Sequence, residues 1–137
     1  YLVTKRSFEG VSLAIRVGSR LPIFHSAIGR AILVGMREPD RERVFSMARD
    51  QSAETESEGR RLFAEAAAEY AEKGYCSAYG SWRSDVNGIA VPVMSLGGGR
   101  VYGLNVGGPS FRVKKKQLET IYAPRLIRAA QTLSIKN

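Results

Sequence analysis

A run of three glycines, residues 97–99, lies between two segments with the composition of β-strands, residues 88–96 and 100–106. Because glycine adopts positive φ angles without steric cost, a glycine run in this setting indicates a hairpin. A phosphate-binding loop also uses glycines, but a helix follows it, whereas residues 101–104 (VYGL) favour a strand. The sequence therefore predicts an antiparallel pair of strands, with residues 107–109 (GGP) ending the sheet.

Further strands are predicted on both sides of a mainly helical middle. In residues 11–17 (VSLAIRV) large apolar side chains alternate with smaller or polar ones, a pattern that buries one face of a strand. Residues 2–6 precede this segment, and residues 8–10 (FEG) suit the turn between them. A short strand is also expected at residues 75–79.

Apolar residues at helical spacing predict helices over residues 26–36, 39–49, from about residue 59 to Lys73, and 113–134. Ser26 is a good N-cap and Gly74 suits a left-handed C-cap. The Glu/Ser-rich residues 50–58 predict a loop or a frayed helix start. Pro124 is expected to kink or divide the last helix, whose apolar stripe includes Ile121 and Tyr122. The fold class predicted is α/β, of the α+β type.

Length and composition are those of one compact domain. The chain has 137 residues, of which 44% are hydrophobic and 25% charged. Cys76 is the single cysteine, so no intrachain disulfide can form, which fits a reducing, cytoplasmic location. No apolar run approaches the roughly 20 residues of a membrane helix. We expect no membrane association, and because the chain opens directly in a strand, we expect it to be a fragment of a longer protein.

The net charge of +8 is concentrated near the C-terminus. Residues 110–137 hold seven Lys or Arg and one acid, so they carry six of the eight charges. A basic terminal helix indicates either a nucleic-acid or acidic partner or a solvated helix face. The sequence has no helix-turn-helix, zinc-finger or interleaved aromatic and basic pattern, which weakens the nucleic-acid interpretation. The role of Lys114, Lys115 and Lys116 stays open.

Catalytic and metal sites are poorly supported. His25 and Ser26 are adjacent, so their side chains should point apart, and no nucleophile elbow is present. One histidine, one cysteine and scattered carboxylates give no zinc-like spacing. An enzyme would depend on His25, Cys76 and Asp85, and Cys76 is expected to be a core residue. We therefore predict neither an enzyme nor a cofactor.

The start of the helix at Ser26 is a better candidate for ligand binding. The backbone amides of Ala27, Ile28 and Gly29 lie at the positive end of a helix dipole, where they can bind a carboxylate or phosphate. Capping of the helix by Ser26 alone explains the same residues, and the sequence does not decide between the two.

Several motifs, in order, resemble the effector-binding domain of IclR-type bacterial transcription regulators. They are VGSRLPI (17–23) with SAIGRAIL (26–33), KGY (73–75), GIAVPV (88–93), LNVGGP (104–109) and YAP (122–124). The resemblance implies a GAF-like, curved antiparallel sheet flanked by helices on both sides. It also implies that a winged helix-turn-helix, a linking helix and a first strand precede residue 1 in the full protein.

By the same resemblance, the domain forms homodimers or homotetramers and binds a small organic acid that alters operator affinity, with DNA bound only through the preceding domain. The implied effector-binding residues are Ile23, Ala27, Ile28, Gly29, Ala78, Tyr79, Trp82, Gly88, Ile89, Asn105 and Gly107. Asn105 and Gly107 replace two serines of the family pattern, and Gly107 is expected to open volume. An aromatic or longer acid is therefore predicted rather than glyoxylate or pyruvate. The alternative is a GAF-like sensor or interaction module without DNA coupling.

Overall fold

The computed structural model describes residues 23–94 and 100–136, so the predicted strands at residues 2–6 and 11–17 and the glycine run at 97–99 lie outside the described residues. The elements, in order, are α1 (Ala27–Gly35), α2 (Glu38–Gln51), α3 (Ala53–Lys73), β1 (Cys76–Tyr79), β2 (Val86–Met94), β3 (Val101–Pro109), α4 (Lys115–Gln117), a π-helical turn η1 (Leu118–Tyr122) and α5 (Ala123–Lys136).

The three strands form an antiparallel sheet in the order β1-β2-β3. The two strands that flank the glycine run pair as predicted, from Met94 opposite Val101 to Val86 opposite Pro109. The strand continues beyond the predicted Val106 through residues 107–109, and it ends at Pro109. A Cβ on Gly107 would lie 2.9 Å from the Asn87 carbonyl oxygen, so glycine here permits the close approach of β2.

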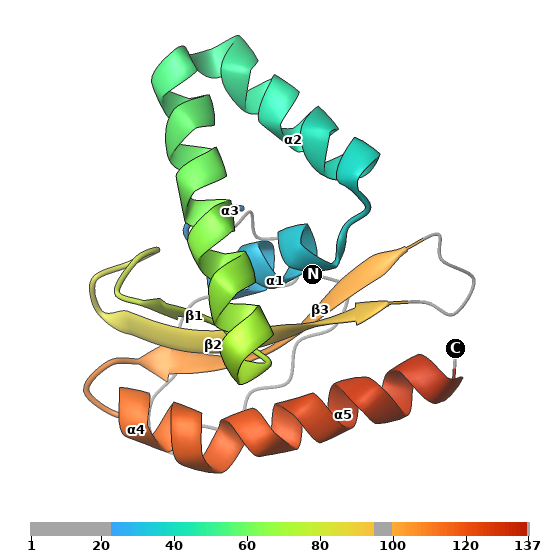
Figure 1. Ribbon diagram of the computed structural model, residues 1–137. Coiled ribbons are helices and arrows are strands. Elements are labelled where there is room, and N and C mark those ends of the chain that lie inside the picture. Colours follow the sequence, from blue (N-terminus) through green and yellow to red (C-terminus); the bar gives the residue numbers. More distant parts are fainter. Residues whose placement is uncertain (1–22, 95–99, 137) are drawn as a thin grey trace.

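Helices cover both faces of the sheet, as the predicted α+β class requires (Figure 1). On one face, α1 and α3 pack through small side chains, with Ala31, Ala66, Cys76 and Ala90 at the centre. On the other face, α5 and η1 pack through larger ones, including Ile89, Val91, Leu118 and Leu126. Small residues let α1 approach the sheet closely, which places the start of this helix directly above β2.

Local capping chemistry defines the helix ends. Ser26 caps α1 as predicted, and Gly74 ends α3 with a φ of 86°. Of the two predictions for residues 50–58, the loop is wrong and the helix start is correct, since α2 continues to Gln51 and Ser52 caps α3, accepting from the Thr55 N–H. Two acids, Glu54 and Glu56, then occupy the first turn, where they complement the helix dipole.

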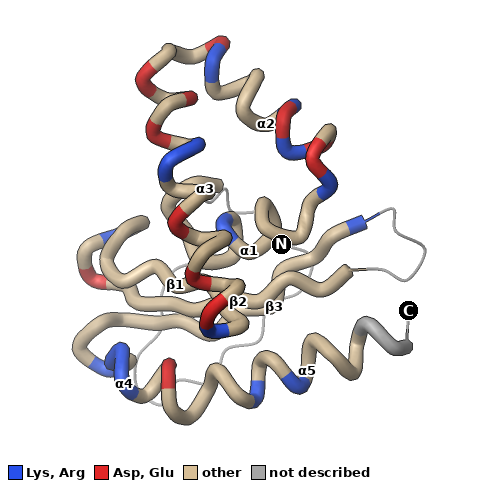
Figure 2. Tube along the Cα trace, in the orientation of Figure 1, with Lys and Arg blue, Asp and Glu red and all other residues tan. Residues whose placement is uncertain are grey.

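The α2–α3 hairpin rises away from the sheet and carries both signs of charge along its length (Figure 2). Phe24, Leu33, Phe45 and Ala48 form its apolar centre. On its surface, Arg49 and Arg60 both donate to Glu56, and Arg60 also donates to Glu42. The arginine hydrogen bonds, that from Arg49 foremost, lower the pKa of Glu56 to about 2.

The last helical segment is divided just before Pro124, where a kink or a division was predicted. The π-helical turn inserts extra backbone, and the Ala123 N–H bonds to the Leu118 carbonyl five residues back. The inserted residue rotates the turn, so Ile121 and Tyr122 are 45% and 37% exposed rather than on the buried stripe. Leu118, Leu126 and Ala130 are buried as expected.

Candidate functional site

The start of α1 offers two backbone amides rather than the three predicted. The Ser26 hydroxyl accepts a hydrogen bond of 3.1 Å from the Gly29 N–H, and the Ser26 carbonyl accepts one from Arg30. Within the described part of the chain, the N–H groups of Ala27 and Ile28 have no acceptor. Ser26 therefore caps the helix, and the same helix end still has donors for an anion.

Below this helix end, the sheet presents a row of residues without bulky side chains. Ala78, Gly88 and Gly107 are direct partners across the three strands. A Cβ on Gly88 would lie 3.8 Å from the Ala27 Cβ, so the row faces α1. Asn105 lies on the same face, opposite Ala90, and is exposed. The structure thus brings together Ala27, Ala78, Gly88, Gly107 and Asn105 from the predicted set.

The volume expected at Gly107 is not there. A Cβ at this position would lie 2.9 Å from the Asn87 carbonyl oxygen and 3.2 Å from the Gly88 Cα, so the β2 backbone already fills the space. At Gly88, by contrast, the nearest atom to an added Cβ would be the Val106 carbonyl oxygen at 3.5 Å, an ordinary contact. Gly88 is therefore less crowded than Gly107, although it is buried and a Cβ there would be in ordinary contact with its neighbours.

Two further predicted residues shape the surroundings of the helix start. The Ile28 side chain covers Gly103 of β3. A Cβ added to Gly103 would lie 2.5 Å from the Ile28 Cγ1 atom. The backbone of Ile23 packs directly on Gly29. A Cβ added to Gly29 would lie 2.6 Å from the Ile23 Cα. Gly29 is thus required for close packing of the chain before α1, and Ile23 forms the wall on that side.

Tyr79 and Ile89 lie on the opposite face of the sheet from the other site residues. Ile89 is fully buried in the core under α5, and Tyr79 packs against the same core. The Tyr79 hydroxyl donates to Glu119 over 3.2 Å, and Lys115 Nζ lies 5.1 Å from its ring centroid. Since neighbouring residues in a strand point to opposite faces, Ala78 with Tyr79, or Gly88 with Ile89, cannot line one cavity.

Trp82 lies in the connection from β1 to β2, which leaves the sheet directly beyond the row of small residues. Its side chain is half-buried, with the Arg83 guanidinium 5.8 Å from the ring centroid. The printed contact of its ring is with its own neighbour, Arg83, so its place in the effector site stays a prediction.

The groups on which an enzyme would depend are engaged separately. His25 Nε2 lies 3.3 Å from Glu58 Oε1, and Asp85 pairs with Arg83. Cys76 is a core residue, as predicted, and its thiol donates to the Ala66 carbonyl oxygen. Burial raises the pKa of this thiol to about 12, which keeps it protonated. Over residues 23–94 and 100–136, no cluster of three potential metal ligands is found.

A polar network at the outer edge of β1 was not predicted. Arg30 of α1 donates to the carbonyl oxygens of Phe24 and Ser77, at 2.8 and 2.7 Å. Glu69 of α3 accepts from the Ser77 N–H and hydroxyl at 2.7 and 2.6 Å. Burial lowers the pKa of Arg30, an effect that the nearby Glu69 opposes. The signal in the sequence was an arginine within the apolar helix segment 27–33.

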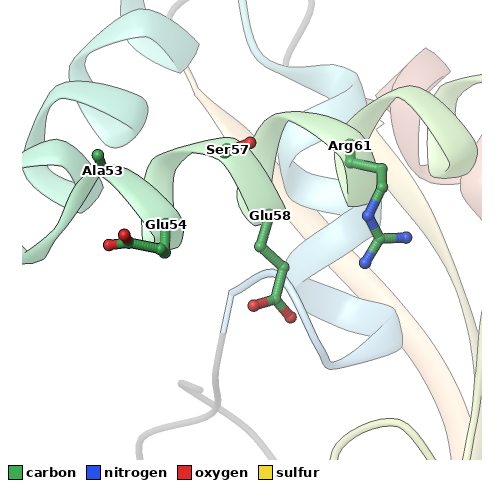
Figure 3. Close-up of a pocket in the computed structure, with 5 residues that line it drawn as sticks. All are labelled: Ala53, Glu54, Ser57, Glu58 and Arg61. Carbon is green, nitrogen blue, oxygen red and sulfur yellow. The ribbon is translucent and has the colours of Figure 1, made fainter.

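A hollow of about 540 Å³ lies elsewhere, along the N-terminal half of α3. Ala53, Glu54, Ser57, Glu58 and Arg61 line it, and Figure 3 shows Glu58 and Arg61 extending to the same side of the helix. Its lining shares no residue with the predicted effector site, and Glu58 is already paired with His25. Separately, no helix among the described residues has the length and apolar composition needed to cross a membrane.

Comparison with known proteins places this architecture among bacterial regulators. The family described as the C-terminal part of the bacterial transcriptional regulator IclR matches residues 3–135. The HTH-type transcriptional regulator TsaQ1/TsaQ2 of Comamonas testosteroni is 28% identical over 116 residues, covering 85% of this chain and 42% of the relative. The chain thus spans less than half the length of this relative, which is a transcriptional regulator rather than an enzyme.

Solved structures give the same result. An IclR family transcriptional regulator from Brucella abortus has a TM-score of 0.83 at 31% identity, with 96% of this chain and 50% of that one covered. The inducer-binding domain of the PobR transcription factor from Acinetobacter, a double mutant in complex with 3-hydroxybenzoic acid, has a TM-score of 0.69 at 19% identity, with 93% and 76% covered. At this identity the second likeness shows the fold alone.

Proposed function

Because the chain belongs to the IclR family of bacterial transcriptional regulators and corresponds to their C-terminal, effector-binding domain, we propose that it binds a small aromatic acid at the start of α1. Binding there changes operator affinity through a DNA-binding domain that lies outside this chain. The observation that carries the proposal is the pair of amides, Ala27 and Ile28, that have no acceptor among residues 23–94 and 100–136, beside a cap that is already satisfied.

The proposed acid group accepts hydrogen bonds from these two N–H groups, at the positive end of the α1 dipole. Its ring lies against the apolar surface provided by Ile28, Ala78 and the backbone of Gly88, and the exposed amide of Asn105 meets a ring substituent. Because Ala27 already packs close to Gly88, the start of α1 has to shift outward to admit a ring.

That shift provides the coupling. Arg30 joins α1 to the segment before it, through Phe24, and to the edge strand, through Ser77. Glu69 links the same strand position to α3. A ligand that moves the start of α1 therefore biases the position of α3 and of the α2–α3 hairpin. A ligand that prefers one of two arrangements of a protein acts at a distance in this way.

Titration calorimetry tests the ligand class. We expect 3-hydroxybenzoate to bind more tightly than pyruvate or glyoxylate, because only the ring buries apolar surface beyond the shared acid group. The 3-hydroxybenzoate complex of the PobR domain supports this choice of probe. Tighter binding of the two short acids would overturn the aromatic assignment, and binding of neither class would overturn the site. Operator binding by the full-length protein, measured with and without the acid, tests the coupling.

A further inference from the structure

A basic surface runs along α4 and α5, on the opposite side of the sheet from the proposed effector site (Figure 2). Its described cations are Lys114, Lys115, Lys116, Arg125 and Arg128, which are all exposed. We propose that this surface, called here the α4–α5 basic surface, binds the phosphate backbone of double-stranded DNA without regard to sequence. The effector domain would then touch the DNA itself.

The first argument is that this charge is not neutralised internally. None of the five side chains lies within 4 Å of a carboxylate oxygen of the described residues. Glu119, the single acid of residues 110–137, is directed inward and accepts from the Tyr75 and Tyr79 hydroxyls. The carboxylates of the described residues therefore leave these five cations available to a partner.

The α2–α3 hairpin provides an internal comparison. There, exposed arginines meet carboxylates of the same hairpin, with Arg43 bound to Asp40 and Arg61 bound to Glu65, each at 2.7 Å. A chain of this composition can thus pair its surface cations. The lack of carboxylate partners for the five cations on α4 and α5, among the described residues, is therefore a property of this surface and does not follow from the overall net charge.

The second argument is the shape and chemistry of the surface. The helix rise of 1.5 Å per residue puts Lys115 and Arg128 about 20 Å apart along the segment. Over that distance a duplex presents on the order of ten phosphates. The loop before α4 is held in place because Asn87 Nδ2 donates to the Val113 carbonyl oxygen and the Ser110 N–H donates to the backbone carbonyl oxygen of Asp85. Lys115 is further positioned over the Tyr79 ring.

Other polyanions fit less well. A membrane surface binds helices whose main apolar face is free, but α5 buries Leu126 and Ala130 of that face against the sheet and leaves Leu133 exposed, with Ile121 and Tyr122 exposed just before it. Protein interfaces are depleted in lysine at their centres, whereas three consecutive lysines suit phosphate contacts. A regulator already held on DNA by another domain also gains from weak additional contacts, because their effective concentration is high.

The test measures binding of the 137-residue chain to a labelled 30-base-pair duplex of arbitrary sequence by fluorescence anisotropy. Five phosphate contacts predict that affinity falls roughly 500-fold between 50 and 200 mM salt. The triple variant K114Q/K115Q/K116Q should bind at least about tenfold more weakly at 50 mM salt, with the slope of log K against log salt reduced to about −1.8. The double variant R125Q/R128Q should show a smaller loss.

The matched control is R37Q/R43Q/R61Q, which removes the same formal charge from arginines already paired with Asp40 and Glu65. It should bind the duplex nearly as well as the parent chain. Equal losses in the two triple variants would overturn the proposal, because net charge alone would then explain binding. Absence of duplex binding at 50 mM salt would overturn it as well. Competition by polyglutamate or by anionic phospholipid vesicles as effective as that by unlabelled duplex would also overturn it. Since DNA binding requires no effector, its failure leaves the proposed acid site unaffected.

Discussion

The guanidinium of Arg30 on α1 donates a 2.7 Å hydrogen bond to the carbonyl oxygen of Ser77 in the edge strand β1. Glu69 of α3 accepts from the N–H and the hydroxyl of the same serine. Side chains from two helices thus satisfy the backbone groups that an edge strand would otherwise expose to another chain. This arrangement ties the proposed effector helix, the sheet and α3 into one unit.

Replacement of Arg30 by methionine should lower the free energy of unfolding by about 2 kcal/mol. The carbonyl oxygens of Phe24 and Ser77 would each lose a charge-assisted hydrogen bond, and methionine retains only the apolar part of the arginine stem. Urea unfolding measures the change. The control, R43M, removes an exposed arginine paired with Asp40 and should cost less than about 0.5 kcal/mol. Equal costs in the two variants would show that the Arg30 contacts add nothing.

Two glycines of the site should respond very differently to alanine. At Gly29 a Cβ would lie 2.6 Å from the Ile23 Cα, so the chain before α1 must move, and we expect a loss of about 2–3 kcal/mol. At Gly88 an added Cβ makes only ordinary contacts, the nearest at 3.5 Å, so G88A should change stability by less than about 1 kcal/mol. Thermal unfolding distinguishes the two, and a larger loss for G88A would contradict the packing described here.

The pKa of Glu56, lowered to about 2 mainly by its hydrogen bond from Arg49, predicts an acid-dependent stability. A carboxyl group whose pKa is lower in the folded than in the unfolded protein stabilises the fold at pH values above its ordinary pKa of 4.5. That contribution should be lost as the pH falls from 4.5 towards 2. In E56Q the decline over this range should be shallower than in the parent chain. Equal slopes by urea unfolding at several pH values would contradict the pairing.

Much of the fold could be predicted from local signals, since caps and hairpins depend on residues close in sequence. Ser26, Gly74 and the strands around residues 97–99 are examples. The wrong loop over residues 50–58 has a local cause as well. Serine and glutamate there were interpreted as loop composition, whereas Ser52 caps α3 and the glutamates occupy its first turn. Composition alone does not separate a loop from a helix start.

The site was harder to predict because it depends on long-range register. Tyr79 and Ile89 were included because the family resemblance implied them, although the alternation of faces along a strand already separates them from Ala78 and Gly88. The space at Gly107 depends on the position of Asn87 in the neighbouring strand, which no local pattern reveals. The Arg30–Ser77 contact joins residues 47 positions apart and was missed for the same reason.

Tyr75 and Tyr79 should titrate at unusually high pH. Burial, followed by the charge of Glu119, raises the pKa of Tyr79, and the same causes act on Tyr75. Because the unfolded chain would lose these protons first, stability is intact below pH 10 and is lost as the pH rises above it. In E119Q, titration followed by tyrosinate absorbance should show a lower pKa for both Tyr75 and Tyr79. Burial should still keep both pKa values above the ordinary value. No change in E119Q would contradict the charge contribution.

The free amides at the start of α1 can be tested without adding charge. In A27P, proline occupies the first helical position, where it is well tolerated, and Ser26 already has the extended conformation that a residue before proline prefers, with φ −98° and ψ 150°. The variant removes one of the two N–H donors proposed for the acid group. Affinity for 3-hydroxybenzoate should fall roughly 10- to 100-fold, the value of one charge-assisted hydrogen bond. H25A, which breaks only the exposed contact with Glu58, should bind normally. Unchanged affinity in a folded A27P variant would place the acid group elsewhere.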